Sequence, residues 1–96
     1  MTQSIAVIVV NYGSHELLDK NFGGATWAEA NASLFVVDNF TTDTERAALA
    51  ALAIDKGWHV TEMSTNVGFG AGVDAGVQAA LRSGHEALLL INPDVE

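Results

Sequence analysis

The sequence contains no cysteine, one proline and only four basic residues. The absence of cysteine excludes disulfide bonds and thiolate chemistry, and such a chain suits a reducing cytosol. The formal net charge is −8, and the cations are scattered along the chain: Lys20, Arg46, Lys56 and Arg82. They cannot form the basic patch that nucleic acids and anionic membranes require. We therefore expect neither kind of partner.

A long apolar run is also missing. The run that begins at Ile5 has no basic residue before it and is far too short to cross a bilayer, so the sequence predicts neither a signal peptide nor a transmembrane helix. Of the 96 residues, 49% are hydrophobic, which is enough for the core of one small domain spanning residues 1–96.

Apolar, β-branched runs alternate with helical patterns. The runs typical of strands are 5–10, 33–37, 59–63 and 86–91. The third alternates polar and apolar residues, which indicates a place near an edge of a sheet. Helices are predicted from Ser14 to about Asn21, from the capping-box pattern at 42–45 to the stop at Gly57, and from about Gly70 to Ser83 with Gly84 closing the helix. This order predicts a parallel sheet with right-handed crossovers.

The third predicted helix has two stripes. The inner, apolar stripe is Val73, Val77, Ala80 and Leu81. The polar stripe, spaced i, i+4 and i+8, is Asp74, Gln78 and Arg82. Elsewhere, two tryptophans are expected to anchor packing: Trp27 and Trp58.

Polar residues follow the predicted strands, and ligands of open α/β sheets bind at that end of the strands. These residues are Asn11, Asp38, Asn66, Asn92 and Asp94. Asp38 is open to two interpretations: a turn or N-cap residue, or an acceptor for a ligand's N–H or hydroxyl group. Asp94 can likewise belong to a simple turn or offer a hard oxygen ligand to Mg²⁺ or Mn²⁺ beside a phosphate, with Glu96 as a second carboxylate.

A glycine-rich loop precedes the third predicted helix. Residues 70–75 formally match the dinucleotide-binding pattern, but they follow the third strand rather than the first, so a dinucleotide-dependent oxidoreductase is not favoured. The small residues can let the helix pack closely on the sheet, or they can bring backbone N–H groups near a ligand's oxygens. The histidines lack metal-ligand spacing, and the serines lack the setting of a hydrolase nucleophile.

Four motifs together resemble the family 2 glycosyltransferases, in particular their rhamnosyltransferase-like branch. They are Val-Ile-Val-Val-Asn-Tyr at 7–12, Phe-Val-Val-Asp-Asn at 35–39, Asn-Val-Gly-Phe-Gly-Ala-Gly-Val-Asp-Ala-Gly-Val at 66–77 and Leu-Leu-Leu-Ile-Asn-Pro-Asp at 88–94. The resemblance covers essentially the whole chain and corresponds to the N-terminal, nucleotide-sugar-binding portion of a GT-A domain. It implies a Rossmann-like three-layer α/β sandwich whose mainly parallel four-stranded sheet has the order 3-2-1-4.

The resemblance also implies a ligand, a nucleotide diphosphate sugar such as dTDP-rhamnose or a UDP-sugar. The positions implied to bind this donor are Asn11, Tyr12, Asp38, Asn66, Gly68 and Asp74. Asp38 matches the aspartate that hydrogen-bonds the nucleobase. Asp94 occupies the place of the DxD motif and would meet Mg²⁺ or Mn²⁺ on the diphosphate.

Three departures from the family pattern stand out. Gly13 replaces a frequent asparagine, Asp74 replaces an amide, and Asn92 replaces the first aspartate of the metal motif. The family's catalytic base and acceptor-binding region correspond to sequence beyond these residues. We therefore expect a truncated donor-binding portion that is inactive alone. The longer enzyme would be an inverting, cytoplasmic transferase at the inner face of the membrane, acting on a glycan or lipid-linked acceptor in cell-wall or polysaccharide biosynthesis.

A different class of function is a non-catalytic α/β module that associates with itself. The fourth predicted strand would be unpaired on one side, and its apolar residues make a poor solvent edge. They are Leu88, Leu89, Leu90 and Ile91. This pattern predicts a homo-oligomer.

Overall fold

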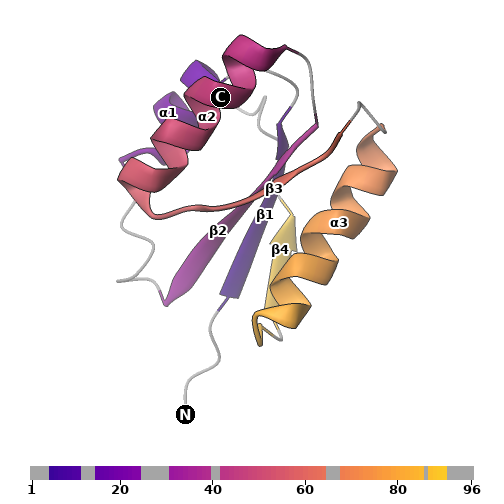
Figure 1. Cartoon of the computed structure of the whole chain (residues 1–96). Coiled ribbons are helices and arrows are strands. Elements are labelled where there is room, and N and C mark those ends of the chain that lie inside the picture. The colour runs from indigo at the N-terminus through magenta and orange to yellow at the C-terminus, as the bar shows by residue number, and fades with distance from the viewer. Residues whose placement is uncertain are drawn as a thin grey trace.

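The structure, a computed structural model, describes residues 5–11, 15–24, 31–39, 42–64, 68–85 and 87–90. Strands and helices alternate along these residues, as predicted (Figure 1). The elements are β1 (Ile5–Asn11), α1 (His15–Phe22), β2 (Ala32–Asp38), α2 (Asp43–Lys56), β3 (His59–Glu62), α3 (Phe69–Arg82) and β4 (Ala87–Leu90). The described helices include none that is long and apolar enough to cross a membrane.

The four strands form one parallel sheet in the order β3-β2-β1-β4. This confirms the predicted order and places β3 at an edge. The long β1–β2 ladder ends with Asn11 opposite Asp38, and Asp38 is in turn opposite Glu62 of β3. The carboxyl ends of these three strands therefore lie side by side.

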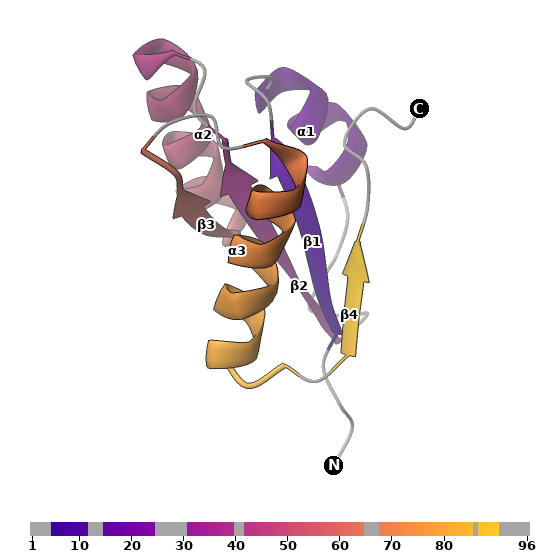
Figure 2. The ribbon, with the colours of Figure 1, turned by 90° about the vertical axis from the view of Figure 1, so that its right-hand side faces the viewer.

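Helices cover both faces of the sheet, so the fold has three layers (Figures 1 and 2). On one face, α1 and α2 pack against β1 and β2. The buried cluster on that face is Val7, Val9, Leu18, Phe22, Leu34, Val36, Leu49, Ala53 and Trp58. On the other face, α3 lies over the complementary strand positions. That buried cluster is Ala6, Ile8, Phe35 and Ala80. Successive side chains of β1 and β2 point to opposite faces of the sheet, and helices cover both faces, which explains why the buried middle of each strand is continuously apolar.

Helix α2 begins and ends where the local sequence predicts. The Thr42 side chain accepts a hydrogen bond from the backbone N–H of Glu45, which satisfies one free donor of the first turn. Gly57 ends the helix in the left-handed region at φ 75°, a conformation that favours glycine. Trp58 follows immediately and is buried in the core, as expected of a packing anchor.

Helix α3 contacts the sheet through small residues, and this corrects part of the predicted inner stripe. Its buried positions are Gly72, Gly76 and Ala80, one turn apart. Leu81, predicted to face inward, has a relative exposure of 48%. Because glycine has no side chain, the helix approaches the sheet closely along the row of positions 72, 76 and 80. Leu81 lies outside this row. The predicted polar stripe is exposed as expected.

Two histidines pack on one aromatic ring, that of Phe35 in the middle of β2. The His59 ring stacks on Phe35 at a centroid distance of 4.4 Å, and the His85 ring meets it edge-on at 5.2 Å. His59 and His85 therefore have packing roles in the fold.

Candidate functional site

Three buried polar residues gather at the carboxyl ends of β1 and β2. Asn11, Asp38 and Asn39 have relative exposures of 2%, 3% and 0%. The backbone N–H of Asn39 donates to the carbonyl oxygen of Asn11 at 3.0 Å, which continues the ladder past the last strand pair. Buried polar groups are destabilising unless they are hydrogen-bonded, so partners must hold these side chains in place.

Asn39 links the sheet to the start of α3. Its Nδ2 donates to the carbonyl oxygen of Gly68 at 3.2 Å. The same oxygen accepts the N–H of Gly72 at 3.1 Å, which begins the helix. Gly68 has φ 86°, in the region that favours glycine. The end of the glycine-rich loop is therefore fixed against β2, one residue beyond Asp38.

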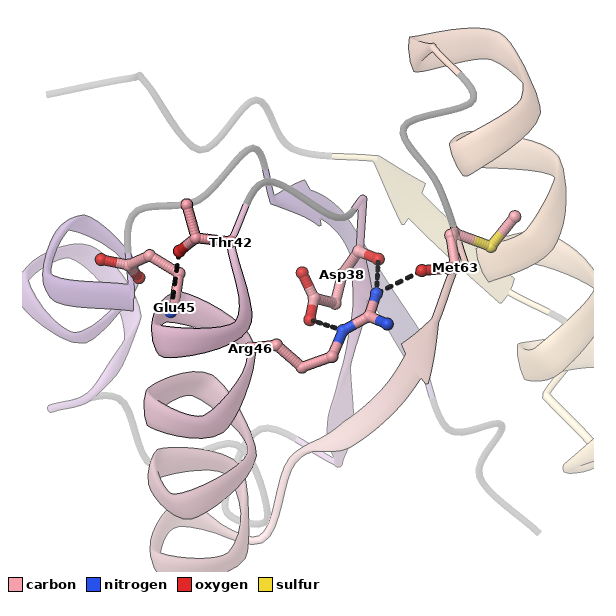
Figure 3. Close-up of polar contacts among 5 residues, drawn as sticks. All are labelled: Asp38, Thr42, Glu45, Arg46 and Met63. Carbon is pink, nitrogen blue, oxygen red and sulfur yellow. Dashed lines mark hydrogen bonds and ion pairs between the residues drawn. The ribbon is translucent and has the colours of Figure 1, made fainter.

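Arg46 of α2 holds Asp38 at two points (Figure 3). Its Nε donates to Asp38 Oδ2 at 3.0 Å, and its Nη2 donates to the backbone oxygen of Asp38 at 3.4 Å. Nη2 also donates to the backbone oxygen of Met63, just beyond β3. The side chain of Asp38 is 4% exposed and that of Arg46 is 22% exposed. This ion pair therefore neutralises a buried carboxylate and joins the ends of two strands to one helix.

The first turn of α2 sets the position of Arg46. Thr42 caps this turn through its side chain, and its backbone oxygen accepts the N–H of Arg46 at 3.0 Å. In a capping box, the carboxylate of Glu45 would return to the backbone of Thr42. Instead, its Oε2 accepts the backbone N–H of His15 at 3.2 Å and lies 2.7 Å from His15 Nδ1. The start of α1 is thereby joined to the start of α2.

The contact with His15 changes the acidity of Glu45. The hydrogen bond to the His15 ring lowers the pKa of the Glu45 carboxyl below its ordinary value of 4.5, against the opposing effect of desolvation. Hydrogen bonds to a carboxylate favour its charged form. Glu45 is therefore an ionised acceptor at neutral pH.

The geometry determines which hydrogen bonds the Asp38 carboxylate can still accept. Oδ2 already accepts a hydrogen bond from Arg46 Nε, whereas Oδ1 has no hydrogen-bond donor among the residues that the structure describes. An ionised carboxylate only accepts hydrogen bonds. Asp38 can therefore accept an N–H or O–H group of a ligand at the carboxyl edge of the sheet. Asp38 is the last residue of β2 and pairs with Arg46, whereas Thr42 caps α2, so the interpretation of Asp38 as an N-cap residue was wrong. Its role as an acceptor for a ligand stays a prediction.

The structure brings some of the predicted site residues together and separates one. Asn11 and Asp38 are neighbours, and Asn39 connects Gly68 to them. Asp74 lies apart from them, exposed on the polar stripe of α3. The other predicted positions lie outside the described residues: Tyr12, Asn66, Asn92 and Asp94.

The metal site stays a prediction. Within the described ranges, no group of three or more histidine, cysteine, aspartate or glutamate side chains could hold a metal ion. Asp38 is the buried acid at this edge, and Arg46 already occupies one of its oxygens. The assignment of the cation to Asp94, which lies outside the described residues, stays a prediction.

Sequence reasoning missed Arg46. The sequence held a weak indication of its role, because Arg46 is one of only four cations and lies in the first turn of a helix whose N-cap was predicted. Because the preceding strand ends at Asp38, an arginine at this place can reach back to the strand end. The role of the Asn39 side chain was also missed, although the residue belongs to a recognised motif.

The chain has the fold of a Rossmann-like α/β domain with a parallel sheet of order 3-2-1-4. Solved structures share this fold. The structure of S. aureus TarS, a glycosyltransferase, matches with a TM-score of 0.70 and 19% sequence identity over 96% of this chain. The structure of S. aureus TarS 1–349 matches with a TM-score of 0.68 and 20% identity, also over 96% of this chain. No protein-family model matches the sequence, and a search of curated proteins found no match.

These likenesses establish a glycosyltransferase-like fold. The chain spans 17% of the longer TarS chain and 28% of the shorter one. The shared fold thus corresponds to a small part of each of those proteins.

Proposed function

We propose that this chain is the donor-binding portion of a glycosyltransferase that moves a rhamnose-like sugar from a nucleotide diphosphate sugar to a glycan or lipid-linked acceptor with inversion. The main support is the buried Asp38 carboxylate at the carboxyl edge of the sheet, with one oxygen held by Arg46. Ligands of open α/β folds bind at this edge. The TarS-like fold gives the proposal its reaction class.

In the proposed complex, Asp38 accepts an N–H group of the nucleobase of a dTDP- or UDP-sugar. Asn11 and Tyr12 lie beside the nucleotide, and Asn66 and Gly68 lie near the nucleoside. Asp74 belongs to this set only through the family resemblance, because its exposed place on α3 gives no support from geometry.

The diphosphate carries most of the charge of the proposed donor. Mg²⁺ or Mn²⁺ held by Asp94 would neutralise this charge as a Lewis acid. The acceptor hydroxyl also needs a base close by. We assign this base to none of the 96 residues, so in this proposal the chain alone binds nucleotide and transfers nothing.

Calorimetric titration with UDP and dTDP in the presence of Mn²⁺ tests this proposal. We expect weak, millimolar binding that Asp38→Ala abolishes. Asp55→Ala removes an exposed acid from the last turn of α2 and serves as the matched control, with unchanged affinity. An absence of binding at millimolar nucleotide, or equal binding by Asp38→Ala, would overturn the proposal.

A second candidate function, self-association, is favoured by β4. Among the described strands, β4 pairs only with β1, and Leu88, Leu89 and Leu90 have relative exposures of 40%, 51% and 46%. Successive side chains point to opposite faces, so apolar surface is exposed on both sides of this strand. A second copy that paired along this edge would cover the leucines and the free backbone groups.

Light scattering over a range of protein concentrations tests this second candidate. We expect a dimer or a larger homo-oligomer. A strictly monomeric species at high concentration would overturn it without affecting the nucleotide-binding proposal, because the two surfaces involve different residues.

A further inference from the structure

We propose that Arg46 is a positioning residue that sets the nucleobase preference of the site. It would do so by fixing which oxygen of Asp38 faces the ligand. This inference rests on the proposed nucleotide-binding function and adds a role for a residue that need not touch the nucleotide.

The guanidinium group of Arg46 restricts the orientation of Asp38. One planar group contacts both the carboxylate and the backbone oxygen of Asp38, and it also contacts the backbone oxygen of Met63. Two contacts to the same residue restrict the rotation of its side chain. The contact to Met63 then fixes the guanidinium itself relative to β3. Asp38 is thereby held in one orientation, with Oδ2 engaged.

The role of Arg46 goes beyond charge compensation. A lysine could neutralise the buried carboxylate, but its ammonium group lacks the rigid planar arrangement of donors that arginine has. The observed contacts use two different nitrogens, Nε for the carboxylate and Nη2 for the two backbone oxygens. The geometry therefore depends on arginine and not on positive charge alone.

The second carboxylate oxygen of Asp38, Oδ1, remains available to a ligand. Oδ1 has no donor among the described residues, and an ionised carboxylate can only accept. The rings of uracil and thymine present an N–H at position 3, whereas cytosine presents a lone pair there. A site built around a fixed acceptor discriminates strongly against a ligand that lacks the matching donor. A mobile carboxylate would discriminate less, because either oxygen could turn away.

The experiment compares the affinities of the intact 96-residue chain for UDP and CDP, measured by titration with Mn²⁺ present. We expect the wild type to favour UDP, and Arg46→Gln to reduce the UDP:CDP affinity ratio about tenfold. Arg46→Lys keeps the charge and should still lose most of the preference. Lys56→Gln removes another cation of α2, one that lies 4.0 Å from Asp19, and should keep the wild-type ratio.

The ratio is informative because partial unfolding would lower both affinities by the same factor. A second measurement needs no variant. In the wild type, the NMR signal of the Arg46 Nε–H should shift on addition of UDP and shift much less with CDP. This signal reports directly on the group that holds Asp38.

The outcomes separate the two proposals. If the wild type binds neither nucleotide, the proposed function fails, and this inference fails with it. If the wild type favours UDP but Arg46→Gln and Arg46→Lys keep the same ratio, only the role of Arg46 is overturned. Should both variants fail to fold, an Nε–H signal that responds equally to UDP and CDP would overturn it.

Discussion

A Cβ atom placed on Gly76 would lie 2.6 Å from Cγ2 of Ile8, so α3 approaches β1 more closely than a side chain at this position allows. The same atom would lie 3.0 Å from Cγ2 of Val37 on β2. One turn earlier, a Cβ on Gly72 would lie 2.9 Å from Cγ1 of Val10. This close approach helps to hold the start of α3 near the carboxyl edge, where Asn39 contacts Gly68.

We expect Gly76→Ala to destabilise the fold by about 1–3 kcal/mol, because the added methyl group overpacks the contact with Ile8 and outweighs the better helix propensity of alanine. Urea denaturation measures this change. Gly70→Ala is the matched control in the same helix, since a Cβ there meets nothing within 4 Å. It should leave stability unchanged or raise it slightly. Equal effects of the two substitutions would contradict the close approach.

We expect Thr42→Ala to destabilise the protein by about 1 kcal/mol, because the backbone N–H of Glu45 loses its capping acceptor. Thr42→Ser keeps the hydroxyl group and should retain most of the stability. The midpoints of urea denaturation of the wild type, Thr42→Ala and Thr42→Ser measure these changes in stability. If the serine variant lost as much as the alanine variant, the cap would not be the source of the effect.

We expect the hydrogen-bonded contact between the Glu45 carboxylate and His15 to stabilise the fold at neutral pH but not in acid. The folded pKa of Glu45 is lowered below 4.5, chiefly by the hydrogen bond to His15. Its contribution is therefore fully present above the unfolded pKa and is lost as the pH falls through the folded pKa. Because the pair is partly exposed, the contribution should be modest, on the order of 0.5 kcal/mol.

The free energies of unfolding of wild type and Glu45→Gln, compared at about pH 6 and about pH 3, test this expectation. The two proteins should differ at the higher pH and converge at the lower. Glu16→Gln removes an exposed acid from the first turn of α1 and is the control, with no such convergence expected. A difference in unfolding free energy that stays constant with pH would show that the contact with His15 contributes nothing measurable.

We expect Leu89→Lys to weaken self-association without unfolding the chain. Leu89 is half-exposed on β4, and a lysine on an edge strand opposes pairing with another strand. Sedimentation velocity measures the association. Ile54→Lys makes the same chemical change at a site on α2 that is 85% exposed, and it should leave association intact. Equal loss of association in both variants would point to net charge and not to β4.

Much of the fold could be predicted from the sequence. The strand runs, the capping residue Thr42 and the terminating glycine at 57 are local signals, and the structure confirms the elements that they predict. The placement of β3 at an edge followed from its alternating pattern. The prediction for Leu81 was wrong, because a helical stripe of large residues was expected and the actual contact line consists of glycines and an alanine.

The candidate site was less predictable than the fold. Polar strand ends identified Asn11 and Asp38, since parallel strands bring their carboxyl ends to one edge. The sequence did not predict that Arg46 would hold Asp38. Nor did it predict that Asn39 would bind the start of α3, because an asparagine beside a strand end has many possible partners.

Glu45 shows most clearly which features the local sequence determines and which depend on tertiary packing. Its spacing from Thr42 was a sufficient local signal for the start of α2, because helix caps depend on only a few neighbouring residues. The carboxylate nevertheless binds His15, 30 positions away, in place of the expected local partner. Such a choice depends on how α1 and α2 pack on the same face of the sheet, and so does the reach of Arg46 to Asp38 and Met63. Local pattern therefore determined the elements and their order, whereas packing decided which side chains meet.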